Sequence, residues 1–204
     1  FTGGMDLKDA EIVSTRYGTV AEERILAKVG PSMCAAWEAL EPVTIVAIEG
    51  WCIGGGVALA VACDWRVAGS DSKIYVPELK LGMNMSWQTI PRLINLIGPA
   101  KTKELLILGE PQDAGLAKEW GLVDHIAESG EALNKSKTIA NQVAKMPPIP
   151  VRMTKRAATV SATALNNATS FMDIDQFMLT QHTLDAKEGI AAFFEKRKPK
   201  FEGK

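Results

Sequence analysis

Residues 44–65 read TIVAIEGWCIGGGVALAVACDW, and this stretch decides the fold class. Its first part, Thr44 to Ile48, is rich in β-branched residues and continuously apolar, which is typical of a strand buried on both faces of a sheet. Gly50 ends that strand. The run from Val57 to Cys63 is rich in alanine and follows three glycines, so it predicts a buried helix that begins at the glycines. A buried strand that leads through a glycine turn into a helix is typical of an α/β fold.

Further strands and helices follow this stretch. We expect strands at 65–68, 73–76 and 122–126, and helices at 87–97, 100–108 and 113–120. Asp113 is a candidate N-cap and Gly121 a candidate C-terminal glycine for the last of these helices. From residue 131 onward the pattern is almost wholly helical. The chain therefore divides into a β/α core, residues 1–128, and a helical C-terminal region, residues 129–204.

Composition narrows the class of function. The chain has 204 residues, 47% of them hydrophobic, which is enough to bury one sizeable core. It carries 23 basic and 24 acidic residues, without the basic excess that electrostatic binding to nucleic acid requires. No apolar run is long enough to cross a bilayer, and no signal peptide opens the chain. We therefore expect neither a nucleic acid nor a membrane as a partner.

The cysteines and histidines indicate neither disulfides nor a metal site. Cys34, Cys52 and Cys63 are odd in number and show no C-x-x-C spacing, which favours apolar packing residues in a reducing compartment. The only two histidines, His125 and His182, belong to no cluster of metal ligands. The expected location is therefore the cytoplasm, and no metal-dependent mechanism is predicted.

Two glycine-rich turns are the candidates for chemistry. They are Thr2 to Leu7, which contains Gly3, Gly4 and Asp6, and Ile53 to Gly56. Consecutive glycines that open a helix leave unpaired N–H groups at the positive end of the helix dipole, where they can hold a phosphate or a developing oxyanion. Neither turn carries the G-K-S/T of a P-loop or the G-x-G-x-x-G of a dinucleotide site. The alternative is that the glycines only permit tight packing of a helix on a strand.

Several motifs occur in a fixed order along the whole chain. They are F-x-G-G-x-D-L at 1–7, G-x-C-x-G-G-G at 50–56, V-P-E-x-x-L-G at 76–82, D-A-x-x-A-x-x-W-G-L-V at 113–123 and E-G-x-x-A-F-x-E-K-R-x-P-x-F at 188–201. This ordered set resembles the crotonase (enoyl-CoA hydratase/isomerase) family. The resemblance implies an α/β fold made of a crotonase-like spiral of ββα units with a helical C-terminal region. It also implies that the family's first strands are missing, because they precede the first of these motifs.

The resemblance implies how the substrate is held. In the family the thioester oxygen of an acyl-CoA accepts hydrogen bonds from two backbone amides, which by motif position are those of Met5 and Gly55. Gly3, Gly4, Asp6 and Gly54 flank these amides and are expected to line the substrate site. CoA is part of the substrate, so no other cofactor is expected.

The acids decide which reaction is expected. Hydratases of the family commonly use two glutamates, of which the second corresponds to Glu78, whereas the first position holds Ala58. A single carboxyl group beside an oxyanion hole can remove a proton at one carbon and return it at another, so double-bond isomerisation follows most directly. The alternative role for Glu78 is an exposed charge at a strand end. The alternative functions are hydration with another second acid, other chemistry of this family, and a non-catalytic acyl-CoA-binding subunit.

Two more candidates lie outside the glycine turns. Trp87 can line an acyl pocket, although an aromatic residue near a helix start is more often part of a core. Lys196 in the basic tail can contact CoA phosphates, because family members often use this region toward a neighbouring subunit; the alternative is a solvated charge. Asp64 is predicted to be a structural acceptor, with Arg66 as its partner. The resemblance further implies a homotrimer or a hexamer.

Overall fold

The structure, a computed structural model, describes residues 1–9 and 18–204. The strands are β1 (Ile45–Ile48), β2 (Trp51–Ile53), β3 (Trp65–Gly69), β4 (Lys73–Tyr75), β5 (Gln112–Asp113) and β6 (His125–Ala127). The helices of the core are α2 (Val20–Ala27), α3 (Val29–Glu38), α4 (Gly55–Ala62), the 3₁₀ turn η1 (Glu78–Leu81), α5 (Thr89–Lys103), the π-helical turn η2 (Glu104–Leu108) and α6 (Ala114–Trp120). The C-terminal helices are α7 (Ala132–Val143), α8 (Pro148–Thr163), α9 (Asn166–Ser170), α10 (Asp173–Gln181) and α11 (Leu184–Glu195).

The strands form two small sheets that the turn at Gly50 connects. β1, β3 and β6 form a parallel sheet in the order β1-β3-β6. In the second sheet β2 pairs in parallel with β4, and β4 pairs in antiparallel orientation with β5. Thr2 adds a parallel bridge to Cys52 at the free edge of β2. The N-terminal segment is thereby placed beside the strand that leads into α4.

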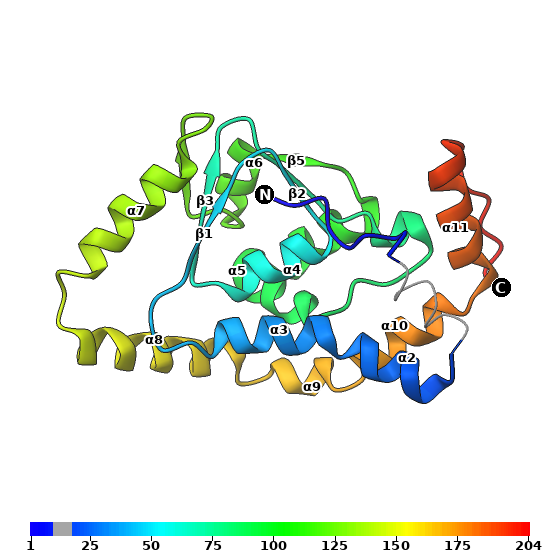
Figure 1. The fold of residues 1–204 in the computed structure, drawn as a ribbon, viewed down its shortest axis with the longest axis horizontal. Coiled ribbons are helices and arrows are strands. Elements are labelled where there is room, and N and C mark those ends of the chain that lie inside the picture. The colour runs from blue at the N-terminus through cyan, green and yellow to red at the C-terminus, as the bar shows by residue number, and fades with distance from the viewer. Residues whose placement is uncertain (10–17) are drawn as a thin grey trace.

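Helix α4 lies at the centre of the core, as the sequence predicted. Val57, Ala58 and Val61 are buried, and α4 packs against α3 and α5 (Figure 1). Gly54 precedes the helix with a φ of 53° and a ψ of −114°, a backbone conformation that is open essentially to glycine alone. The glycine turn therefore allows the chain to enter a buried apolar helix whose first residue, Gly55, is half-buried.

The helix predicted at 113–120 is confirmed together with both of its caps. The carboxylate of Asp113 accepts a hydrogen bond from the Leu116 amide at 2.8 Å, and Gly121 ends the helix with a φ of 85°. The two helices predicted before it are confirmed within α5, because Gly98, with a φ of 72° and a ψ of 169°, is not helical and separates them, and the second one leads into η2. The predicted start at residue 87 is wrong, because Trp87 and Gln88 have positive φ angles and α5 begins at Thr89.

The predicted pairing of the Asp64 and Arg66 side chains is wrong, although Arg66 Nη2 donates to the Asp64 backbone carbonyl at 3.5 Å. Asp64 is a structural acceptor, since its carboxylate accepts the Thr44 amide at 2.7 Å, but its ionic partner is Lys155 of α8 at 2.7 Å. The buried guanidinium of Arg66 pairs instead with Asp124 at 2.7 Å. Both ion pairs join segments that are distant in sequence. A prediction based on the nearest charged residue therefore named the wrong ionic partner for Asp64.

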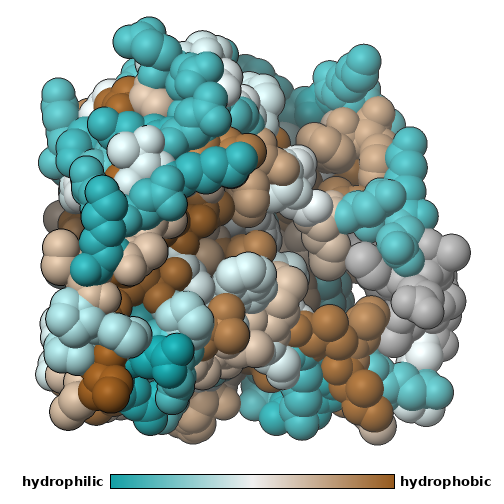
Figure 2. Space-filling view, turned by 60° about the vertical axis from the view of Figure 1, so that its left-hand side comes forward, coloured by the Kyte–Doolittle hydropathy of each residue, from teal (hydrophilic) through white to brown (hydrophobic). Residues whose placement is uncertain are grey.

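The C-terminal helices surround the core on two sides. α7 packs against β1 and β3. In Figure 1, α8 lies below α7, and none of its residues is buried. Figure 2 shows apolar side chains among hydrophilic ones on the face that carries these two helices. A groove of about 500 Å³ between α7, α8 and β1 includes Val43, Leu133 and Val151. At the opposite end α11 packs against η1 so closely that a Cβ on Gly189 would lie 2.5 Å from the backbone of Leu81.

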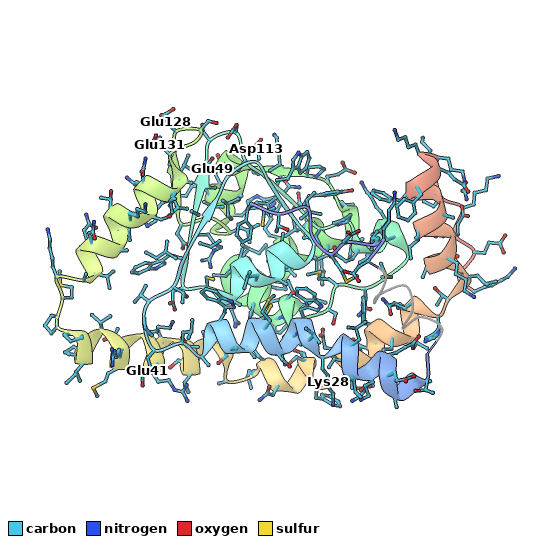
Figure 3. The ribbon with its side chains drawn as sticks, viewed as in Figure 1. Lys28, Glu41, Glu49, Asp113, Glu128 and Glu131 are labelled. Carbon is cyan, nitrogen blue, oxygen red and sulfur yellow. The ribbon has the colours of Figure 1, made fainter. Side chains whose placement is uncertain are left out.

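Glu49 fixes the start of α7 and is expected to stabilise the fold. Its carboxylate accepts hydrogen bonds from the amides of Ala132 at 2.6 Å and Gly130 at 3.1 Å, and it lies at the end of the sheet beside Glu131 (Figure 3). Glu49→Ala should lower the free energy of unfolding by about 1–2 kcal/mol, because it removes a charged helix cap. Urea denaturation measures this change. Glu128→Ala, at an exposed neighbouring position, should leave the midpoint unchanged, and equal effects of both variants would contradict the capping role.

Candidate active site

The two glycine-rich turns meet at one place. The Thr2 amide donates to the Trp51 carbonyl at 2.9 Å, and the Ile53 amide donates to the Thr2 carbonyl at 3.1 Å. Gly4 follows with a φ of 89°, and a Cβ at this position would lie 3.0 Å from the Ile53 carbonyl oxygen. The first turn therefore follows the backbone of β2 so closely that glycine is required there.

Met5 and Gly55 present the amides that the sequence singled out. Gly55 is the first residue of α4, so its N–H has no acceptor within the helix and lies at the positive end of the helix dipole. Among residues 1–9 and 18–204, neither the Met5 amide nor the Gly55 amide donates a hydrogen bond. Both residues line the same pocket. Two amides without an acceptor in the described part of the chain therefore belong to residues that line one cavity, and an oxyanion hole is built from two such donors.

Glu78 lies directly beside the second turn. It begins η1 immediately after Pro77, and a Cβ on Gly54 would lie 2.5 Å from its Oε1. The residue as a whole is half-buried, but Oε2 is fully buried and has no hydrogen-bond partner in the described part of the chain. An unpaired buried carboxyl oxygen destabilises the ionised form, and such groups occur preferentially at functional sites.

Burial raises the pKa of Glu78 to about 7, and a hydrogen bond from its own backbone amide opposes this to a lesser extent. The first cause is loss of hydration, because transfer of a carboxylate into apolar surroundings favours the protonated form. Met83 and Met85, which are buried, and Leu81 line the pocket around it. A carboxyl group whose pKa is near neutrality can both accept and return a proton at physiological pH, as general acid and base catalysis requires.

The raised pKa also predicts a stability effect. Above pH 7 the native state holds an ionised Glu78 at a cost, whereas below the ordinary value of 4.5 the carboxyl is protonated in both states and the cost vanishes. Glu78→Gln should therefore raise the free energy of unfolding at pH 8 by about 1–3 kcal/mol, and by less at pH 5. Urea denaturation at the two pH values measures the difference. Glu104→Gln, which alters an exposed glutamate, should show no such pH-dependent gain.

The position of the family's other glutamate lies in the core. Ala58 is fully buried in α4 and does not line the pocket. The only carboxyl side chains that line it, among the described residues, are Glu78 and Asp6. Asp6 Oδ1 accepts the Lys8 amide at 2.9 Å, so this carboxylate also holds the turn that carries Met5. Glu78 is thus the one lining carboxyl that burial prepares for proton transfer.

The remaining walls of the pocket are largely apolar. The cavity has a volume of about 620 Å³. The Trp87 indole forms the wall of the pocket next to the start of α4, since a Cβ on Gly55 would lie 2.8 Å from two of its ring atoms. Phe177 of α10 and Phe193 of α11 contribute from the C-terminal region. A cavity of this kind, with a few converging polar groups, suits an apolar chain that ends in a polar head.

The structure brings together nearly all the predicted site residues. The pocket is lined by Gly3, Gly4, Met5, Asp6, Gly54, Gly55, Glu78 and Trp87. Lys196 does not line it, and the adjacent Arg197 does, held by Glu188 through two hydrogen bonds. A contact of Lys196 with a neighbouring subunit's ligand stays a prediction. Sequence reasoning missed Tyr75, Ser86, Phe177 and Phe193, and only Phe193 carried a signal, since it belongs to the C-terminal motif.

Metal ligands, membrane-spanning helices and free thiols are considered for residues 1–9 and 18–204. No group of three or more histidine, cysteine, aspartate or glutamate side chains in these parts of the chain could hold a metal ion. Within the same residues, none of the helices combines the length and the apolar character that crossing a bilayer demands. Cys34, Cys52 and Cys63 are buried free thiols, and burial raises the pKa of each.

Comparisons with known proteins agree on one family. The family model described as enoyl-CoA hydratase/isomerase matches residues 1–204. The crotonyl-CoA hydratase of Syntrophomonas wolfei is 35% identical over 193 residues, which cover 94% of this chain and 74% of that protein. A probable enoyl-CoA hydratase of Bacillus subtilis is 34% identical over 209 residues, which cover all of this chain and 78% of that protein.

A solved structure shares the fold. The structure of a putative enoyl-CoA hydratase/isomerase family protein from Hyphomonas neptunium superposes with a TM-score of 0.71 at 35% identity, and the match covers 96% of this chain and 74% of that one. The similarity therefore extends over almost the whole chain and includes both glycine turns, the Glu78 segment and the C-terminal helices.

Proposed function

Because the chain belongs to the enoyl-CoA hydratase/isomerase family, we propose that it moves the double bond of an enoyl-CoA thioester with Glu78 as the single general base and acid. The family and its α/β fold, both expected from the motifs, are confirmed. The choice of reaction is the proposal. One observation carries it: the pocket has one carboxyl prepared for proton transfer, and the place of the family's first glutamate is the buried Ala58.

The proposed reaction uses the geometry as follows. The thioester oxygen of a 3-enoyl-CoA accepts the Met5 and Gly55 amides. The Glu78 carboxylate removes a proton from C2, and the electron pair moves into a dienolate whose charge rests on the thioester oxygen. The protonated Glu78 then returns the proton to C4, which gives the 2-enoyl-CoA. Each preset amide donor lowers the barrier by roughly 3–4 kcal/mol, because it meets charge that develops only during the reaction.

Hydration of a 2-enoyl-CoA is the second candidate. Relatives at 34–35% identity carry the names crotonyl-CoA hydratase and probable enoyl-CoA hydratase, which favours this reaction. A hydratase needs a group that orients water opposite Glu78. Asp6 and Ser86 are two polar side chains of the pocket that could replace the absent glutamate. Ser86 Oγ already donates to Asp173, so its oxygen is free only as an acceptor of a water proton.

Product identification tests the two candidates. The protein is incubated separately with 3-enoyl-CoA and 2-enoyl-CoA thioesters of several chain lengths, and the products are separated by chromatography and identified by mass. Conversion of the 3-enoyl to the 2-enoyl thioester without change of mass supports isomerisation. A mass increase of one water from the 2-enoyl thioester supports hydration. Binding of the thioesters without any turnover would contradict both and favour an acyl-CoA-binding subunit.

The partner expected from this proposal is a second and third copy of the chain. Helix α8 buries no residue within one chain and exposes Ile149, Met153 and Val160. A helix whose apolar side chains stay exposed is typical of a subunit interface. The proposed state is a homotrimer or a pair of trimers, and light scattering combined with size-exclusion chromatography tests it.

A further inference from the structure

The Ser86–Trp87–Gln88 segment, hereafter the indole turn, has an unusual backbone. Trp87 has a φ of 62° and Gln88 a φ of 56°, and Lys196 is the only other described residue besides glycine with a positive φ. The left-handed region is unfavourable for residues with a Cβ, and two of them in succession persist only where the surroundings hold them. This strain lies in the pocket, because Ser86 and Trp87 both line it.

The C-terminal region holds the indole turn from one side. Asp173, the first residue of α10, is only 7% exposed. Its Oδ2 accepts hydrogen bonds from Ser86 Oγ at 2.7 Å and from the Gln88 amide at 3.2 Å. A buried carboxylate requires such partners, and here both partners belong to the strained turn.

An ion pair of the core holds the indole turn from the other side. The buried Arg92 donates through Nη1 to the carbonyls of Trp87 at 2.9 Å and Gln88 at 3.3 Å. Glu38 of α3 accepts from the same guanidinium at 2.8 and 3.1 Å, so Arg92 cannot follow a shift of the turn without losing its carboxylate. The Trp87 and Gln88 carbonyls and the Gln88 amide are thus fixed by groups of two elements, Arg92 of α5 and Asp173 of α10, and Glu38 of α3 holds Arg92 in place.

These hydrogen bonds fix the position of the Trp87 indole ring. A Cβ on Gly55 would lie 2.8 Å from the Trp87 ring, and a Cβ on Gly30 would lie 2.0 Å from it, so the indole is packed between the start of α4 and helix α3. Gly55 carries one of the two amides proposed for the thioester oxygen. The ring is therefore the wall of the pocket next to that amide, and a shift of the ring changes the space that the thioester can occupy there.

We infer that Asp173 is a positioning residue of this site: it holds the indole turn in its left-handed form and so fixes the Trp87 wall beside the Gly55 amide. The catalytic consequence rests on the proposed function, whereas the structural consequence does not. Asp173 touches neither the pocket nor Glu78, so its effect passes through Ser86, Trp87 and Gln88.

Three substitutions on α10 test the inference. Asp173→Ala removes the acceptor, and the turnover number should fall about 10–100-fold, as expected for a reacting group displaced by about 1 Å. Asp173→Asn keeps an acceptor oxygen for both donors and should restore most of the activity. Asp175→Ala is the matched control and should leave turnover unchanged. Asp175 lies two residues after Asp173 on the same helix and pairs with Arg24 at the surface.

A spectroscopic readout separates positioning from a loss of stability. The indole N–H resonance of Trp87, assigned with Trp87→Phe, should shift in Asp173→Ala and remain in place in Asp173→Asn and Asp175→Ala. In a Trp87→Ala background, Asp173→Ala should lower turnover less than threefold further, because its effect passes through the ring. If wild-type protein turns over no thioester, the proposed function fails, but the resonance still decides the inference. An unshifted resonance in folded Asp173→Ala, or fully additive losses of turnover, would overturn it.

Discussion

Glu78→Gln should lower turnover of the physiological enoyl-CoA by about 10²–10⁴-fold, the range that general acid and base groups contribute. Glutamine is close in shape to glutamate and leaves the buried site without a charge, but it cannot accept and return a proton. The Met5 and Gly55 amides remain, so binding of the thioester should persist. Steady-state kinetics and calorimetric titration with a saturated acyl-CoA measure the two effects separately.

The pH dependence of turnover by the wild-type protein tests whether Glu78 acts in its ionised form, as a base. The pKa of Glu78 is raised to about 7, and the proposed reaction begins with the carboxylate, so kcat/KM should rise as the pH increases through 7 and level off above it. Glu104→Gln, at an exposed pair with Lys101, should keep both the rate and the profile. A Glu78→Gln variant that binds and turns over the thioester like the wild type would remove Glu78 from the mechanism.

The local parts of this site could be predicted because local physics determines them. The apolar run after Gly54–Gly56 specifies a buried helix, and a glycine turn before a helix leaves its first amides free, whereas the choice of position 55 among them came from the resemblance to the family. Glu78 was singled out by its place in the V-P-E motif, and in the structure it begins η1 directly after Pro77. For such segments the pattern of neighbouring residues and the tertiary structure favour the same conformation.

The long-range parts could not be predicted from neighbouring residues. Asp64 pairs with Lys155 rather than with Arg66, and the indole turn owes its conformation to Asp173, which lies 85 residues from Gln88. The sequence around Trp87 has the composition of a helix start, and tertiary hydrogen bonds override that preference. The same holds for Phe177 and Phe193, which reach the pocket only because α10 and α11 fold back onto η1 and the turn after it.

Gly54→Ala should impair both folding and catalysis, although it adds only one methyl group. The φ of 53° and ψ of −114° at Gly54 lie outside the regions open to alanine, so we expect a loss of about 1–3 kcal/mol in the free energy of unfolding. The new Cβ would also lie 2.5 Å from Glu78 Oε1 and would displace the carboxyl group. A displacement of about 1 Å lowers turnover by up to about 10²-fold, to be measured on folded protein by steady-state kinetics.

Gly50→Ala provides the control that separates these two effects. Gly50 also has a positive φ, of 59°, but a Cβ there would meet no atom within 4 Å. Both alanine variants should therefore lose stability in urea denaturation, whereas only Gly54→Ala should lose turnover per folded molecule and show a shifted pH profile. Equal losses of turnover would mean that backbone strain alone disturbs the site. Gly54 precedes Gly55 in the chain and lies next to the Glu78 carboxyl. A loss of turnover in Gly54→Ala alone would therefore indicate that Gly54 sets the distance between the proposed oxyanion donor and the proposed base.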